Sequence, residues 1–225
     1  MHLKFLIYFN RKLVVSLLQI KEDLTTEILW RKKELQNIKK LYDKNIIQEE
    51  INIGSVSKIK ITQTAESKYI LRSAVPLIYA HWEGFFKKSI DIIHQELDTY
   101  SVDYNKLDHS ILAALTLNKH TEEYKFKELK FNDIIVNMES NLKWKVLEKF
   151  TNRYNLNLKK YEKYKSVIQE ILKVRNAISH GENAYHFEDI TKINDYINNT
   201  IKLMLLTRNE VMTYLEYQNY YKIKN

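Results

Sequence analysis

The chain has 225 residues, and 36 Lys and Arg against 28 Asp and Glu give it a formal net charge of +8. Its 3 Gly and 1 Pro are few, since an average composition would give about 27 such residues. This scarcity argues against sandwiches and barrels, which need frequent turns, and the glycines are too far apart for a phosphate-binding loop. The absence of cysteine excludes disulfides and thiol nucleophiles and fits a reducing cytoplasm. We therefore expect a single all-α domain over residues 1–225, located in the cytoplasm.

Residues 1–19 form an N-terminal extension for which the sequence predicts no definite structure. Its two apolar stretches are separated by Asn10-Arg11-Lys12. A spanning helix needs about 20 mainly apolar residues, and a signal peptide needs an unbroken apolar stretch. We expect a segment packed on the domain and no membrane association, with a membrane-proximal segment as the minor alternative.

Hydrophobic periodicity predicts five main helices, over residues 14–43, 64–97, 132–153, 158–180 and 189–220, with a short one at 108–116. Residues 44–63 are predicted to be a connector, with at most a small strand at Ile59 and Ile61. The helix over 64–97 is apolar nearly all round, which predicts a central position. Pro76 within it predicts a kink or a break, and Gly84 is expected to permit close approach of another helix.

The histidines and carboxylates give no indication of a metal site. The seven histidines include no His-x-x-x-His pair, and the carboxylates are scattered over helix surfaces. We therefore expect neither a metal nor a cofactor.

Arg175 and His180, at the end of the helix over 158–180, are the residues best suited to chemistry. Gly181 is placed to cap that helix. Histidine is the side chain best suited to proton transfer near neutral pH, so His180 can act as an acid or a base, while the fixed donors of Arg175 suit the added negative charge of a phosphorane. Together they suit attack by a ribose 2′-hydroxyl on its adjacent phosphate, which requires RNA and no metal.

Two interpretations of these residues stay open from spacing alone. Asn176 shares a helix face with His180 and is expected to fix its ring or to touch the substrate. In the alternative, His180 only caps the helix, where a cation is favoured, and Arg175 is a solvated surface charge.

The string from Arg175 to His180, Arg-Asn-Ala-Ile-Ser-His, resembles the signature of the HEPN superfamily (higher eukaryotes and prokaryotes nucleotide-binding domains). Two further strings resemble those of a bacterial branch of it: Trp-Arg-Lys-Lys-Glu-Leu at residues 30–35 and Ala-His-Trp-Glu-Gly at residues 80–84. This resemblance covers residues 20 to 205 or so and implies a HEPN-like helical bundle with two or more long antiparallel helices.

The resemblance also implies an activity: a metal-independent endoribonuclease of toxin–antitoxin or antiphage defence systems. Such proteins work as homodimers in which the motifs of two protomers face one cleft. Carried over, Arg175 clamps the phosphate, His180 is the acid–base group, and Asn176 is the polar residue after the arginine. RNA and an antitoxin or defence-system protein are the implied partners. The alternative is a non-catalytic HEPN-like module that binds nucleic acid or protein.

One position departs from the pattern of some HEPN toxins. They carry a tyrosine two positions after the histidine, and a partner nucleotidyltransferase modifies it. Glu182 stands at that position here, so we do not expect this modification.

Glu83 is the glutamate of the Ala-His-Trp-Glu-Gly string and lies on the buried helix, where a carboxylate must be paired. It is expected either to bond to Arg175 or His180, as part of the catalytic group, or to pair with Arg31 or Arg72 as a structural bridge. The sequence leaves both pairings open.

The remaining candidates are neighbours of these motifs. His81 is predicted to be a satisfied core histidine, and Trp82 to belong to the core or to a dimer interface. Lys173, Lys87 and Lys88 are expected to contact the RNA backbone.

Overall fold

The computed structural model describes residues 2–53, 56–100, 102–116, 130–131, 141–182, 186–187 and 189–222, except for the side chains of 2–15, 51–53, 56 and 116. The elements are α1 (His2–Lys44), β1 (Ile46–Ile53), β2 (Val56–Gln63), α2 (Ala65–Thr99), η1 (Tyr104–Lys106), α3 (His109–Thr116), α4 (Trp144–Arg153), α5 (Lys159–Glu162), α6 (Lys165–Ser179) and α7 (Thr191–Glu216). The predicted all-α class is confirmed, because these residues are helical apart from one two-stranded hairpin and the connections.

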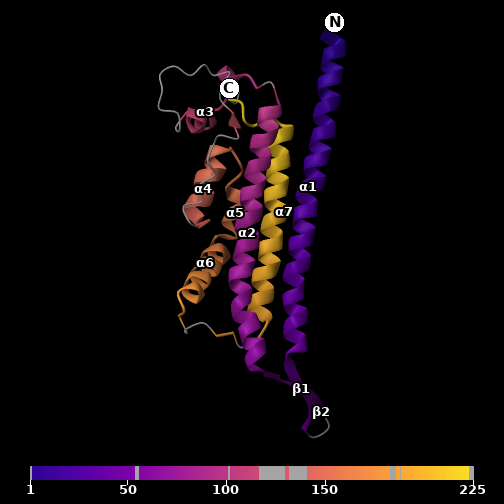
Figure 1. Ribbon diagram of the computed structural model, residues 1–225, viewed down its shortest axis with the longest axis vertical. Helices are drawn as coiled ribbons and strands as arrows, with labels where there is room; N and C mark the ends of the chain where they lie inside the picture. The colour runs from indigo at the N-terminus through magenta and orange to yellow at the C-terminus, as the bar shows by residue number, and fades with distance from the viewer. Residues whose placement is uncertain are drawn as a thin grey trace.

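Three long helices make the centre of the molecule: α2 and α7 lie side by side with α1 along them, and α3 to α6 line the other side (Figure 1). α1 runs antiparallel to α2, as the sequence predicted (Figure 1). The core lies where the apolar faces of these helices meet. Its fully buried members include Leu24 and Leu35 of α1, Phe85, Phe86 and Ile90 of α2, and Val211 and Leu215 of α7.

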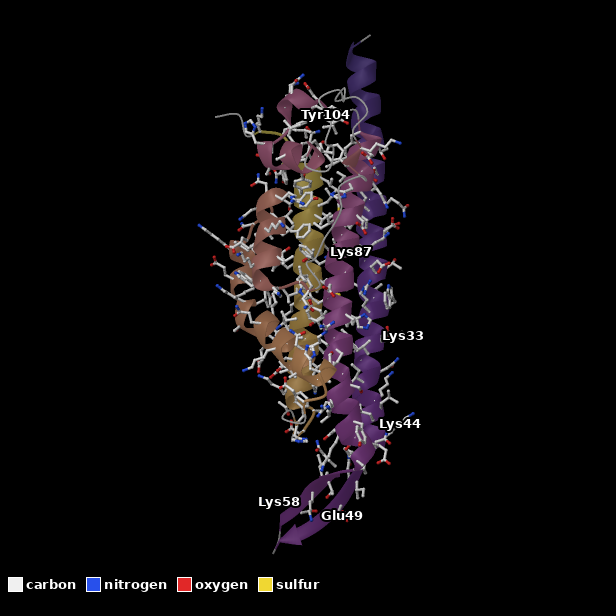
Figure 2. The ribbon with its side chains drawn as sticks, turned by 60° about the vertical axis from the view of Figure 1, so that its left-hand side comes forward. Lys33, Lys44, Glu49, Lys58, Lys87 and Tyr104 are labelled. Carbon is white, nitrogen blue, oxygen red and sulfur yellow. The ribbon has the colours of Figure 1, made fainter. Side chains whose placement is uncertain are left out.

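The segment between α1 and α2 forms a regular hairpin, which is more than the small strand that the sequence predicted. β1 and β2 pair antiparallel from Ile46 opposite Gln63 to Ile53 opposite Val56. The hairpin extends beyond the ends of the helices, as the positions of Glu49 and Lys58 show (Figure 2).

α2 continues through Pro76, so the predicted break is absent. Thr64 caps its start, with its hydroxyl oxygen accepting from the Ser67 N–H at 3.1 Å. Proline removes one backbone donor, but Val75 and Ile78, on either side of it, are fully buried. Burial of this face against α1 and α7 outweighs the lost hydrogen bond.

Two predicted helices are shorter than the periodicity suggested. Residues 141–143 are not helical and α4 begins at Trp144, so the helix predicted over 132–153 is wrong in this part; residues 132–140 lie outside the described residues. The helix predicted over 158–180 is divided into α5 and α6. Buried Tyr161 bonds to Thr207 of α7 at 3.2 Å, so packing on α7 fixes the direction of α5.

α1 begins at His2, well before the predicted start at Val14, so the backbone of the N-terminal extension is helical. Among the described residues, no helix combines the length and the apolar character that crossing a membrane requires.

Candidate active site

Arg175 lies near the C-terminal end of α6, and three groups hold its guanidinium. Nη1 donates to the side-chain oxygen of Asn141 at 3.0 Å and to that of Asn176 at 2.9 Å. The guanidinium carbon lies 5.2 Å from the centre of the Tyr79 ring, within cation–π range. Nε and Nη2 form no hydrogen bond with the described residues.

The Tyr79 ring is in turn fixed by Glu83, one turn further along α2. The Tyr79 hydroxyl donates to Glu83 Oε1 at 3.2 Å, and the Leu142 N–H donates to the hydroxyl at 2.5 Å and to the carboxylate at 3.0 Å. Burial, reinforced by the Glu83 carboxylate, raises the pKa of Tyr79. The hydroxyl therefore stays protonated and acts as a donor near neutral pH.

Glu83 thus reaches Arg175 indirectly, through the Tyr79 ring. Among the described residues it forms no ion pair or hydrogen bond with Arg175 or His180, and none with Arg31 or Arg72. Both direct pairings that the sequence left open are replaced by the bonds to Tyr79 and to the backbone before α4.

His180 ends α6 in a glycine cap. The Gly181 backbone has φ +77°, its N–H donates to the Ile178 carbonyl at 3.1 Å, and the Glu182 N–H donates to the Ala177 carbonyl at 2.9 Å. This is a Schellman motif, and it confirms the cap predicted at Gly181. The His180 side chain is exposed and has no hydrogen-bond partner in the described part of the chain.

No hydrogen bond joins the side chains of Arg175 and His180 within the described residues. Asn176 forms a hydrogen bond with each of them. Its side-chain oxygen accepts a hydrogen bond from Arg175, and its backbone carbonyl accepts one from the His180 backbone N–H at 2.9 Å. Its amide therefore orients Arg175, and no bond to the His180 ring is present. Arg72 of α2 donates to the Glu182 carbonyl, which ties the end of α6 to the bundle.

The three lysines expected at the RNA backbone lie on α2 and α6. Lys173 and Lys87 are exposed and Lys88 is half-buried, and Lys87 lies about midway along α2 (Figure 2). Burial raises the pKa of Asp91, and Lys87 and Lys88 oppose this shift. The two lysines therefore interact with the Asp91 carboxylate of their own helix, which partly offsets their positive charge.

The strings at residues 30–35 and 80–84 meet where α1 packs on α2. His81 is 4% exposed, its ring lies edge-on to Trp30 at 5.4 Å, and its Nδ1 and Nε2 lie 3.5 Å from Arg31 and 3.3 Å from Glu34. Burial lowers the pKa of His81, which Glu34 opposes and Arg31 reinforces. A Cβ added to Gly84 would stand 3.4 Å from Arg31 Nη1. This is an ordinary contact with the end of a flexible side chain, so the close approach of a helix expected at Gly84 is not what this position shows.

These strings form the contact of α1 with α2. The core position predicted for His81 is confirmed, but its buried Nε2 has no hydrogen-bond partner among the described residues, so the prediction that this histidine is satisfied is wrong. Trp82 is 3% exposed and belongs to the core, as do Phe85 and Phe86. None of the three stacks on the Arg175 side chain.

Among the described residues, no group of three or more His, Asp and Glu side chains is placed to hold a metal ion. The carboxylates near Arg175 are used in hydrogen bonds to protein groups, as Glu83 illustrates.

The fold and the site define an all-α bundle in which a packed helix ends in an Arg-x4-His sequence. A family model described as MAE_28990-like HEPN matches residues 20–220. The chain therefore belongs to this family of the HEPN superfamily, as the resemblance predicted. No curated protein and no solved structure matches the chain.

Sequence reasoning missed two members of the site, Tyr79 and Asn141. Tyr79 belongs to the helix over 64–97, whose apolar character hides its polar role, although its i,i+4 spacing to Glu83 is a usable signal of a bonded pair. Asn141 had no such signal, because it lies in a segment whose apolar spacing resembled a helix.

Proposed function

We propose that this chain is a metal-independent endoribonuclease that cleaves RNA by attack of a 2′-hydroxyl on the adjacent phosphate. Membership of the HEPN superfamily supports a nucleotide-binding or ribonuclease-type function. The observation that carries the proposal is the state of the two motif side chains. Arg175 is held by Asn141, Asn176 and Tyr79 with two nitrogens to spare, and His180 is exposed without a partner among the described residues.

In the proposed reaction His180 takes the proton of the 2′-hydroxyl, and the 2′-oxygen attacks phosphorus. The free nitrogens of Arg175 bind the phosphate oxygens, whose negative charge rises in the phosphorane. The bond from phosphorus to the 5′-oxygen then breaks, and this oxygen takes up the proton that His180 accepted, which returns the imidazole to its neutral form. The products are a 2′,3′-cyclic phosphate and a 5′-hydroxyl.

The proposal includes a homodimer and a role as a toxin or antiphage effector. A second copy would supply its own motif to the cleft, as the family resemblance implies. Growth arrest on expression of the wild type, and none with Arg175→Ala at equal protein level, is the expected result. Equal arrest by both would contradict the effector role.

The test of the activity is cleavage of RNA by purified protein in EDTA. The wild type is expected to cut, and His180→Ala to lose at least about 100-fold in rate, as for removal of a general acid–base group. His109→Ala is the matched control, because His109 is exposed and lies on α3, away from the motif. Activity that EDTA abolishes, or that His180→Ala retains, would overturn the mechanism.

A second candidate is a non-catalytic HEPN-like module that binds nucleic acid or protein. The missing hydrogen bond between Arg175 and His180 favours it, because a ready catalytic pair converges on one atom. Intact RNA binding without cleavage at any protein concentration would support this candidate over the first.

A further inference from the structure

We infer that a groove between α1 and α7 is a second nucleic-acid surface, which binds the phosphodiester backbone of single-stranded RNA. The groove has a volume of ≈ 980 Å³. Its lining consists of Lys32, Leu35, Gln36, Lys39, Lys40 and Asp43 from α1, and Asn194, Ile197, Asn198, Ile201 and Lys202 from α7. α1 and α6 lie on opposite sides of α2 and α7 (Figure 1), so the groove faces away from Arg175.

The lining residues follow helical spacing on both walls. Those of α1 recur at steps of three and four from Lys32 to Asp43, and those of α7 do so from Asn194 to Lys202. The α1 wall is therefore one face about 16 Å long, at a rise of 1.5 Å per residue. A stacked strand places a phosphate about every 3.4 Å, so this length suits four or five nucleotides.

The positive charge of the groove is not neutralised by the protein. Lys32, Lys39, Lys40 and Lys202 are exposed, and in the described part of the chain none of them forms an ion pair or a side-chain hydrogen bond. Elsewhere in the described residues, Lys106, Lys160 and Lys192 each pair with a carboxylate. Four free ammonium groups against the one carboxylate of Asp43 make an electropositive channel, which is the electrostatic feature of a nucleic-acid groove.

The floor and the amides fit a nucleotide chain better than a simple anion. Leu35 is 0% exposed and Ile197 is 5% exposed, so they close the floor from below. Half-buried Ile201 is the apolar side chain of the lining that a ribose or base can contact. The side chains of Gln36, Asn194 and Asn198 form no hydrogen bond within the described residues. They supply both donors and acceptors, as contact with ribose hydroxyls requires.

The basic surface continues past the groove. Lys202 also lines an adjoining hollow of ≈ 400 Å³ with Lys159, Lys160 and Lys163. Lys160 is paired with Glu210 at 2.7 Å, but Lys159 and Lys163 have no carboxylate partner among the described residues. Lys202 therefore joins two depressions into one basic path, as expected for a ligand longer than the groove.

The inference takes RNA as the ligand from the proposed function, but its test needs no cleavage. We would measure binding of a fluorescent 20-residue oligouridylate to full-length His180→Ala protein, with and without Lys39→Gln and Lys202→Gln. The control is the pair Lys21→Gln and Lys145→Gln, which are exposed lysines of α1 and α4 outside the groove. Both pairs lower the formal net charge from +8 to +6 (8 − 2).

The groove pair is expected to weaken binding about tenfold near 0.1 M salt and to reduce the slope of log affinity against log salt by about 1.4, at 0.7 per lost phosphate contact. The control pair is expected to leave both values unchanged. Equal effects of the two pairs would overturn the inference. So would an equal loss of polyglutamate binding, or a change of oligomeric state with unchanged RNA affinity.

The groove and the cleavage site fail separately in this design. A wild type that does not cut RNA, with binding lost in the groove pair, overturns the proposed activity and supports the groove. A wild type that cuts RNA, with RNA binding unchanged in the groove pair, supports the proposed activity and overturns the groove.

Discussion

The guanidinium carbon of Arg175 on α6 lies 5.2 Å from the centre of the Tyr79 ring on α2. These residues are 96 positions apart (175 − 79), and the contact joins the Arg-x4-His motif to the most buried helix of the bundle. Tyr79 is held by Glu83 and by the Leu142 N–H. The position of the arginine is therefore set by the core.

Two replacements of Tyr79 distinguish the role of its ring from the role of its hydroxyl. Tyr79→Phe keeps the ring under Arg175 and leaves Glu83 on the Leu142 N–H, so it should cost about 1 kcal/mol of unfolding free energy and keep most cleavage activity. Tyr79→Leu removes the ring and should slow RNA cleavage at least tenfold, since a misplaced group costs catalysis steeply. Denaturant unfolding and cleavage rates measure both. Equal activity of the Phe and Leu variants would contradict this positioning role.

Arg175→Lys tests the need for a planar group with several donors. Lysine keeps the charge, but it cannot bond Asn141 and Asn176 and also present two further nitrogens to a phosphate. We expect about a 100-fold loss of cleavage rate with a much smaller effect on RNA affinity. A kinetic comparison of kcat and KM measures this split. A loss confined to KM would show that Arg175 only binds the substrate.

Gly181 should be sensitive for its backbone alone. A Cβ there would meet nothing within 4 Å, yet φ is +77°, a conformation that costs an L-residue about 1 kcal/mol or more. Gly181→Ala should therefore lower the melting temperature by about 2–4 °C, and Gly181→Asn by less, because asparagine tolerates this region. Thermal unfolding of the wild type and the two variants measures these differences. An unchanged melting temperature for Gly181→Ala would contradict the role of Gly181 in the helix cap.

His94 should make the fold sensitive to acid. It is 2% exposed, its Nε2 lies 2.5 Å from the Tyr154 hydroxyl, and burial lowers its pKa to about 4. Between pH 6.5 and 4 the unfolded chain binds a proton that the folded chain refuses. Stability from this group is therefore complete above pH 6.5 and falls by about 1.4 kcal/mol per pH unit on acidification.

The His94→Gln variant should lose less stability between pH 7 and 5 than the wild type, by urea unfolding at each pH. His109→Gln, at an exposed position, should keep the wild-type profile. Identical pH profiles for all three proteins would exclude His94 as a cause of acid sensitivity.

The sequence predicted those parts of the fold that depend on local signals. The amphipathic stripes of α1 and α7, the Thr64 start of α2 and the Gly181 cap depend on helix periodicity and on known cap residues. Pro76 predicted a kink or a break, and the break is absent because packing of α2 on α1 and α7 outweighs the local rule. Residues 141–143 are non-helical because tertiary bonds from Tyr79 and Glu83 satisfy the Leu142 N–H.

The motif residues of the candidate site could be predicted from the sequence, but the residues that hold Arg175 in place could not. Arg175, Asn176 and His180 stand together in the sequence, whereas Asn141 and Tyr79 reach Arg175 only through the fold. The groove shows the same limit. Lys39 and Lys202 belong to different helices, and only the packing of α1 on α7 brings them to one groove.

The most direct measurement of the central claim is cleavage, in EDTA, of an RNA in which a single nucleotide 5′ to the cut carries no 2′-hydroxyl. We predict that wild-type protein cuts the all-ribose strand to a 2′,3′-cyclic phosphate and a 5′-hydroxyl, and that the single 2′-deoxy substitution abolishes cleavage at that position. Cleavage that persists at the 2′-deoxy position would contradict attack by the 2′-hydroxyl, and with it the assigned roles of His180 and Arg175.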